Sequence, residues 1–243
     1  METYRKSAVA AGVLFIVATV ADVISRAALL TPVLGLPDPL AAVAANETSV
    51  VLGAVLLFVG AAAAAGIAIA MYPVMRGHGE ALALGSVGFR LIEGTFYLGI
   101  VVCLLILVAM GEQAASSGPV AFAVPATVVL AAREALGQVG VLAFAVGATM
   151  YYWLFYRSRL VPRWLSAWGL VAIASLMVSV VLVISGVAEP MSPPQVLLAA
   201  PIGVQEMVLA GWLIAKGFRP ADSVVTGAPV EAGLAASAKA TAA

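Results

Sequence analysis

The stretch from Thr48 to Met71 reads TSVVLGAVLLFVGAAAAAGIAIAM and contains no charged residue. Roughly 20 helical residues cross a bilayer hydrocarbon core of about 30 Å, so this stretch is long enough to span a membrane. The whole chain of 243 residues has the same character, with 63% hydrophobic and 10% charged residues and a mean hydropathy of +1.12. One globular core cannot bury that much apolar surface, which indicates an integral membrane protein.

Five further stretches have comparable length and hydropathy. In chain order, the expected spans are approximately residues 7–30, 48–71, 81–110, 121–152, 165–187 and 195–217. The segments between them are rich in Gly, Pro and Ser and have the composition of turns. The sequence therefore predicts an all-α, polytopic transmembrane bundle of about six helices within one domain, residues 1–219. Residues 220–243 are mostly small or polar, which predicts a disordered cytoplasmic tail.

Basic residues fall in one set of loops if successive spans alternate in direction. That set holds Arg5, Lys6, Arg76, Arg157, Arg159, Arg163, Lys216 and Arg219, whereas the other set holds only acids, Asp38, Glu47, Glu112 and Glu189. Because cytoplasmic loops are enriched in Lys and Arg, both the N-terminus and the C-terminus are expected in the cytoplasm. The most basic loop is surrounded by aromatic residues, which predict an interfacial belt: Tyr151, Tyr152, Trp153, Tyr156, Trp164 and Trp168.

Several classes of function lack the residues that they would need. The net charge of zero gives no electrostatic basis for binding nucleic acid. Cys103 is the single cysteine and His78 the single histidine, so disulfides, Cys or His metal sites and His-based triads are not expected. Glu93, Glu134 and Glu206 could hold a hard cation, but nearby arginines would compete with it. Neither a metal nor another cofactor is expected.

Seven ionisable residues nevertheless lie inside the expected spans. They are Asp22, Arg26, Arg90, Glu93, Arg133, Glu134 and Glu206. Exposing them to lipid would cost roughly 3 kcal/mol each, or about 20 kcal/mol in all. We therefore expect these side chains to face protein or water in the interior of the bundle.

Helical spacing predicts which of these residues pair within one helix. Asp22 and Arg26 are four positions apart, and Arg90 and Glu93 are three apart, so each pair can share one helix face. Tyr97 lies four positions after Glu93 and could donate its hydroxyl to that carboxylate.

The other three charges have no such partner in their own helix. Arg133 and Glu134 are neighbours about 100° apart around the helix axis, so one of them must address a different helix. Gln138 lies one turn after Glu134. Glu206 has no basic residue within four positions, so its partner lies on another helix or it carries a proton.

Two interpretations of these residues remain open. They could line one interior cavity that leans toward the extracytoplasmic side, where four acids against three arginines leave one carboxylate unmatched. They could instead form buried ion pairs that only fix helix packing. The candidate ligand-binding or proton-linked residues are Asp22, Arg26, Arg90, Glu93, Tyr97, Arg133, Glu134, Gln138 and Glu206.

Three stretches resemble one family of bacterial membrane proteins. They read FRLIEG at 89–94, LVPRWLSAWGL at 160–170 and EMVLAGWLIAKGF at 206–218. The family is catalogued as domain of unknown function 4386, and the likeness covers nearly all of the chain before the tail. The resemblance implies a compact multi-helix protein of the bacterial plasma membrane, with Arg and Glu in a middle helix and Glu in the last. It implies no particular activity.

Binding or transport is the preferred hypothesis for function. The interior would accept a small polar molecule or a lipid headgroup, with Arg26, Arg90 and Arg133 contacting an anionic group. One alternative is an accessory or sensor subunit whose buried charges are structural. Another is an intramembrane lipid-modifying enzyme with Glu134 or Glu206 as general base, for which the sequence offers no clear nucleophile. The expected partners are the lipid bilayer and an anionic lipid or small polar ligand, and the oligomeric state stays open.

Overall fold

The computed structural model describes residues 2–118, 120–190 and 192–219. The predicted disordered tail, residues 220–243, lies outside the described residues. Six helices of the described chain are long and apolar enough to cross a membrane, and no strand occurs in these ranges. The predicted fold class, an all-α polytopic transmembrane bundle, is confirmed.

Six long helices and a few short elements make up the described chain. The first long helix combines α1 (Glu2–Val23), the π-helical segment η1 (Ile24–Leu30) and α2 (Thr31–Leu34). The other five are α4 (Glu47–Met75), α5 (Glu80–Ser117), α6 (Val120–Ser158), α7 (Arg163–Ile184) and α8 (Pro193–Ala215). The short helix α3 (Pro39–Ala45) precedes α4, and the 3-10 turn η2 (Arg76–His78) joins α4 to α5. Helices α7 and α8 end two or three residues before the expected 187 and 217.

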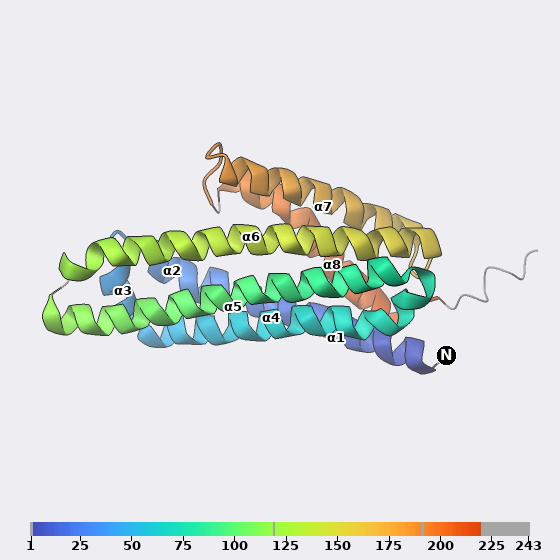
Figure 1. Cartoon of the computed structure of the whole chain (residues 1–243), viewed down its shortest axis with the longest axis horizontal. Helices are drawn as coiled ribbons and strands as arrows, with labels where there is room; N and C mark the ends of the chain where they lie inside the picture. The colour runs from blue at the N-terminus through green and yellow to red at the C-terminus, as the bar shows by residue number, and fades with distance from the viewer. Residues whose placement is uncertain (1, 119, 191, 220–243) are drawn as a thin grey trace, which may run out of the picture.

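The long helices form a closed ring around a common interior. Helix α1 packs on α4, α4 on α5, α5 on α6, α6 on α7 and α7 on α8, and α8 packs back against α1. Figure 1 shows α5 and α6 running side by side along the length of the bundle, with the α7–α8 hairpin tilted across one side of them. A ring of this kind places one face of every helix toward the interior.

Both ends of the described chain lie at the same end of the bundle. The backbone N–H of Arg219 donates to the carbonyl oxygen of Leu160 in the α6–α7 turn, at 2.9 Å. The N-terminus and the turn around η2 are at this end in Figure 1. We call it the basic end, because the basic loops of the sequence gather here. The prediction that this end faces the cytoplasm rests on those Lys and Arg residues.

Helices α5 and α6 are longer than a bilayer is thick. They have 38 and 39 residues, which at 1.5 Å per residue is about 57 Å. Helix α7 has 22 residues, or about 33 Å, which is close to a hydrocarbon core of about 30 Å. The far ends of α5 and α6 therefore extend past the α7–α8 hairpin, beside α2 and α3 (Figure 1).

Small residues let α4 approach the first long helix closely. A Cβ atom added at Gly53 of α4 would lie 2.8 Å from Cδ2 of Leu30 in η1. A Cβ atom added at Gly66 of α4 would lie 3.0 Å from Cδ1 of Leu14 in α1. Small residues at such contacts are typical of helix packing in membranes.

The expected aromatic belt divides into two groups. Trp153 and Trp164 are exposed near the basic end, as amphipathic rings at a membrane interface would be. Tyr151 and Tyr152 are fully buried instead, so their assignment to the belt is wrong. They lie on the face of α6 that packs against the interior, where their hydroxyls meet polar groups of α8.

Candidate functional site

Two adjoining cavities occupy the interior of the ring. The first, which we call the Arg90 cavity, has a volume of about 300 Å³ and the polar lining residues Thr19, Asp22, Arg90, Glu93, Tyr97 and Glu206. The second, the Arg133 cavity, has a volume of about 400 Å³ and is lined by Asp22, Arg26, Tyr97, Arg133, Glu134 and Gln138 among others. Asp22 and Tyr97 line both cavities and therefore form part of the wall between them.

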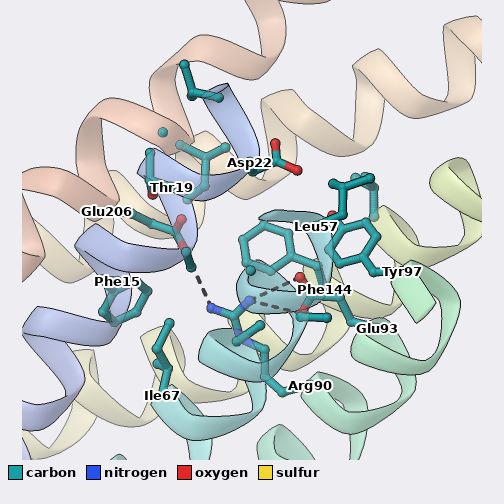
Figure 2. A pocket seen from close by; sticks show the side chains of 18 of the residues that line it. Phe15, Thr19, Asp22, Leu57, Ile67, Arg90, Glu93, Tyr97, Phe144 and Glu206 are labelled. Carbon is teal, nitrogen blue, oxygen red and sulfur yellow. Dashed lines mark hydrogen bonds and ion pairs between the residues drawn. The ribbon is translucent and has the colours of Figure 1, made fainter. Parts of the chain in front are cut away.

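Arg90 of α5 is the centre of the first cavity. Its Nη1 atom lies 2.9 Å from Oε2 of Glu93 on the same helix, and its Nη2 atom lies 3.6 Å from Oε1 of Glu206 on α8. Figure 2 shows the guanidinium between the two carboxylates, which approach it from different helices. Arg90 and Glu93 are 3% and 4% exposed, so this charge cluster is removed from solvent. The guanidinium of Arg90 thus forms ion pairs with two carboxylates.

Three aromatic rings surround the same guanidinium. Its carbon lies 4.7 Å from the ring centroid of Phe144, 5.8 Å from that of Tyr151 and 5.9 Å from that of Phe15. Ring faces attract a cation within about 6 Å, and more strongly where water is excluded. Arg90 is therefore held by α1 and α6 as well as by α5 and α8.

Polar contacts join α8 to α6 and α7. The Tyr151 hydroxyl lies 3.4 Å from Oε1 of Glu206, and the Tyr152 hydroxyl donates to Oε1 of Gln205. The Nε2 of Gln205 in turn donates to the carbonyl oxygen of Leu165, at 3.0 Å. Sequence reasoning missed Tyr151, Tyr152 and Gln205 as parts of this network. Two sequence features could have indicated these residues. They are the two adjacent tyrosines and the adjacent Gln and Glu, which are polar residues inside otherwise apolar spans.

The Arg133 cavity contains a second ion pair at its edge. The Nε of Arg26 lies 2.7 Å from Oδ1 of Asp22, and its guanidinium carbon lies 5.7 Å from the ring centroid of Tyr97. Arg26 belongs to η1, and π-helical segments occur often at functional sites. The hydroxyl of Ser25 fixes η1 to α4 by donating to the carbonyl oxygen of Gly53, at 2.8 Å.

Arg133 and Glu134 of α6 have different surroundings from the other charges. Gln138 donates its Nε2 to Oε1 of Glu134, at 2.8 Å. Among the described residues, no ion pair within 4.0 Å joins Arg133 or Glu134 to an opposite charge, and the buried Nε of Arg133 has no hydrogen-bond partner. The cavity beside them is also lined by Pro190 and Gln195, near the α7–α8 connection.

The structure brings all nine candidate residues to these cavities. The pairs Asp22–Arg26 and Arg90–Glu93, predicted from spacing, are confirmed. The expected single cavity is two adjoining cavities, which share lining residues that include Asp22 and Tyr97. The expected hydrogen bond from Tyr97 to Glu93 is not found in the described part of the chain, where Tyr97 lies beside Arg26 and Glu93 accepts from Arg90.

The chemistry available in these cavities is ionic contact and hydrogen bonding within apolar walls. Phe15, Leu57, Ile67 and Phe144 contribute apolar surface to the Arg90 cavity. No group of three His, Cys, Asp or Glu side chains among the described residues is placed to hold a metal ion. His78 lies at the basic end, where its Nδ1 is 3.1 Å from the carbonyl oxygen of Val74.

Comparison with known protein families identifies a family for this chain. A family model described as a domain of unknown function, DUF4386, matches residues 10–217. No curated protein and no solved structure is significantly similar to the chain. The matched residues include every residue of the two cavities named above. The chain therefore belongs to the family of membrane proteins that carry the domain of unknown function DUF4386.

Proposed function

We propose that this protein binds or transports a small polar molecule or a lipid headgroup within its helical ring. One observation carries the proposal: the seven in-span charges, together with Tyr97 and Gln138, converge from four helices on two cavities that share a wall. Volumes of about 300 and 400 Å³ are within the range of small-ligand pockets in proteins. We place the protein in the bacterial plasma membrane with both ends in the cytoplasm.

The distribution of ion pairs supports a binding role over a purely structural one. A structural network gains most when each buried charge has a partner, because an unpaired one costs several kcal/mol. Five of the seven charges meet this condition, since Arg26 pairs with Asp22 and Arg90 with two glutamates. The other two lie beside open cavity volume. Ligand groups would satisfy them there.

The arrangement of α8 supports movement of a ligand as well as its binding. Helix α8 packs closely on α1 and α7, but it reaches the interior of the ring through side chains, Glu206 to Arg90 and Gln205 to Tyr152. Contacts of this kind can exchange for contacts with a ligand. The α7–α8 hairpin is therefore the element that we expect to move between states.

A ligand panel tests the proposal on the full chain in detergent and in lipid nanodiscs. Thermal unfolding is measured with neutral polyols, organic cations, organic anions, zwitterions and defined lipids. We expect at least one class to raise the unfolding temperature of the wild-type protein and to have a smaller effect on Glu206→Gln. Glu112→Gln is the control, because Glu112 is exposed and is not among the lining residues of either cavity. No stabilisation by any class, together with wild-type behaviour of Glu206→Gln, would contradict the proposal.

A further inference from the structure

Arg133 and Glu134 differ from the other five of the seven interior charges. Arg26 is held by Asp22, and Arg90 by Glu93 and Glu206. The Nε atoms of Arg133 and Arg90 are both buried without a hydrogen-bond partner, but only Arg90 also has ion pairs. Glu134 accepts from Gln138 without a cation. Of the seven interior charges, the two that form no ion pair with a described residue are thus adjacent in sequence, opposite in sign, and part of the lining of one cavity.

From this juxtaposition we infer that the Arg133 cavity binds a zwitterion, a molecule that carries an ammonium group together with a phosphate or carboxylate group. Arg133 binds the anionic group through its guanidinium, and Glu134 binds the ammonium group through its carboxylate. The inference rests on the proposed function and names its ligand class. Both the amino acids and the phosphoethanolamine headgroup of a lipid have this chemistry.

Charge balance favours a zwitterion over a simple ion. The charged residues lining the Arg133 cavity are Asp22, Arg26, Arg133 and Glu134, two acids and two arginines. A lone anion would meet the carboxylates of Asp22 and Glu134, and a lone cation would meet the two guanidiniums. Like charges brought together in this way oppose binding. A zwitterion adds no net charge and satisfies Arg133 and Glu134 together.

The height of the site in the membrane is consistent with ligand access from the headgroup region. Arg133 precedes the exposed Trp153 by twenty positions in α6, which at 1.5 Å per residue is about 30 Å. That distance is one hydrocarbon thickness, so Arg133 lies near the interface opposite the basic end. Pro190 and Gln195, near the connection between α7 and α8, line the same cavity and lie at the same level.

Apolar side chains on the neighbouring turns offer a surface for acyl chains. Val128 of α6 is 62% exposed, and Leu197 of α8 is 74% exposed. Both helices belong to the ring that encloses the Arg133 cavity. A lipid could therefore place its headgroup at Arg133 and Glu134 while its tails stay in the bilayer, and a soluble zwitterion could enter from water at the same level.

The test compares matched soluble probes on the purified full-length protein. Phosphoethanolamine and glycine carry both charges, ethanolamine only the ammonium, and inorganic phosphate only the anion. Isothermal titration calorimetry should give phosphoethanolamine or glycine at least about tenfold tighter binding than ethanolamine and inorganic phosphate. Arg133→Gln and Glu134→Gln should each weaken that binding by about tenfold or more. The controls Arg157→Gln and Glu112→Gln change exposed residues and should bind as the wild type does.

Further measurements distinguish a lipid ligand from a water-soluble ligand and test whether each variant folds. Native mass spectrometry from nanodiscs of phosphatidylethanolamine or phosphatidylglycerol shows whether a zwitterionic lipid is retained in preference to an anionic one. Retention that is lost in Arg133→Gln identifies the lipid headgroup, whereas binding of soluble glycine or phosphoethanolamine alone identifies a water-soluble ligand. Circular dichroism checks the fold of each variant, and Arg133→Lys, which keeps the charge, should restore part of the binding.

Three outcomes would overturn the inference. Inorganic phosphate or ethanolamine binding as tightly as the zwitterions would identify a simple ion site. Folded Arg133→Gln and Glu134→Gln proteins that bind like the wild type would place the ligand elsewhere. A panel in which only other ligand classes stabilise the protein would reject the zwitterion and leave the proposed function intact, whereas no binding in any class would reject both.

Discussion

Arg90 of α5 and Glu206 of α8 lie 3.6 Å apart in the interior of the ring, although 116 positions separate them in the sequence. Glu93 approaches the same guanidinium at 2.9 Å, so one cation links two helices and two carboxylates. Helix α8 packs mainly on α1 and α7, and it meets α6 through Tyr151 and Tyr152. This contact therefore ties the α7–α8 hairpin to the opposite side of the bundle.

Replacing Arg90 by Met should destabilise the protein severely. The substitution leaves Glu93 and Glu206 buried without a cation, and breaking a buried pair in this way costs about 3–5 kcal/mol. Thermal or denaturant unfolding in detergent measures the effect. Arg76→Met is the control because Arg76 is exposed in η2, and its stability should stay near that of the wild type. Equal stability of the two variants would mean that Arg90 does not hold the hairpin.

Replacing Tyr152 by Phe should weaken the junction of α6 with α8. Tyr152 and Gln205 are both 0% exposed, and the hydroxyl donates to the Gln205 amide oxygen. Removing one partner of a buried hydrogen bond costs about 1–3 kcal/mol. Unfolding measurements on Tyr152→Phe and on the half-buried Tyr156→Phe would compare the two sites. A loss no greater in Tyr152→Phe than in Tyr156→Phe would refute the prediction.

Replacing Gly169 by Ala should disturb the contact between α6 and α7. A Cβ atom at this position would lie 2.6 Å from Cδ1 of the Tyr152 ring. The ring cannot move away readily, because its hydroxyl is bonded to Gln205. We expect a loss of about 1–3 kcal/mol from overpacking. Gly88→Ala in α5 is the matched control, since a Cβ atom there meets nothing within 4 Å and better helix propensity should raise stability slightly. Equal effects of the two alanines would show that the α6–α7 contact adapts.

Cysteine labelling should show that the two ends of the bundle lie on opposite sides of the membrane. In a Cys103→Ala background, Gln113→Cys lies near the far end of α5 and Arg157→Cys at the basic end, both at exposed positions. A thiol reagent that does not cross membranes should label position 113 in intact cells and position 157 only after permeabilisation. The physical basis is the retention of Lys and Arg on the cytoplasmic side. The reverse pattern would invert the orientation.

Local features of this protein followed from the sequence because they depend on a fixed helical period. The spacing of Asp22 and Arg26 places both side chains on one face of a helix, and their ion pair forms there. The pair Arg90–Glu93 follows for the same reason. The predicted hydrogen bond from Tyr97 to Glu93 is not found in the described part of the chain. Arg90 donates to Glu93 instead, and the Tyr97 ring lies against Arg26. Arg90 thus occupies the Glu93 carboxylate that the spacing had assigned to Tyr97.

Tertiary structure decided which helix faces meet. Hydropathy and length determined by themselves that the described chain forms six helices able to span a membrane, since apolar segments of this length satisfy their backbone polar groups within one helix. They could not determine the rotation of each helix about its axis, which depends on the packing of all six together. That rotation buries Tyr151 and Tyr152, brings Glu206 to Arg90, and leaves Arg133 and Glu134 without ion-pair partners beside a cavity.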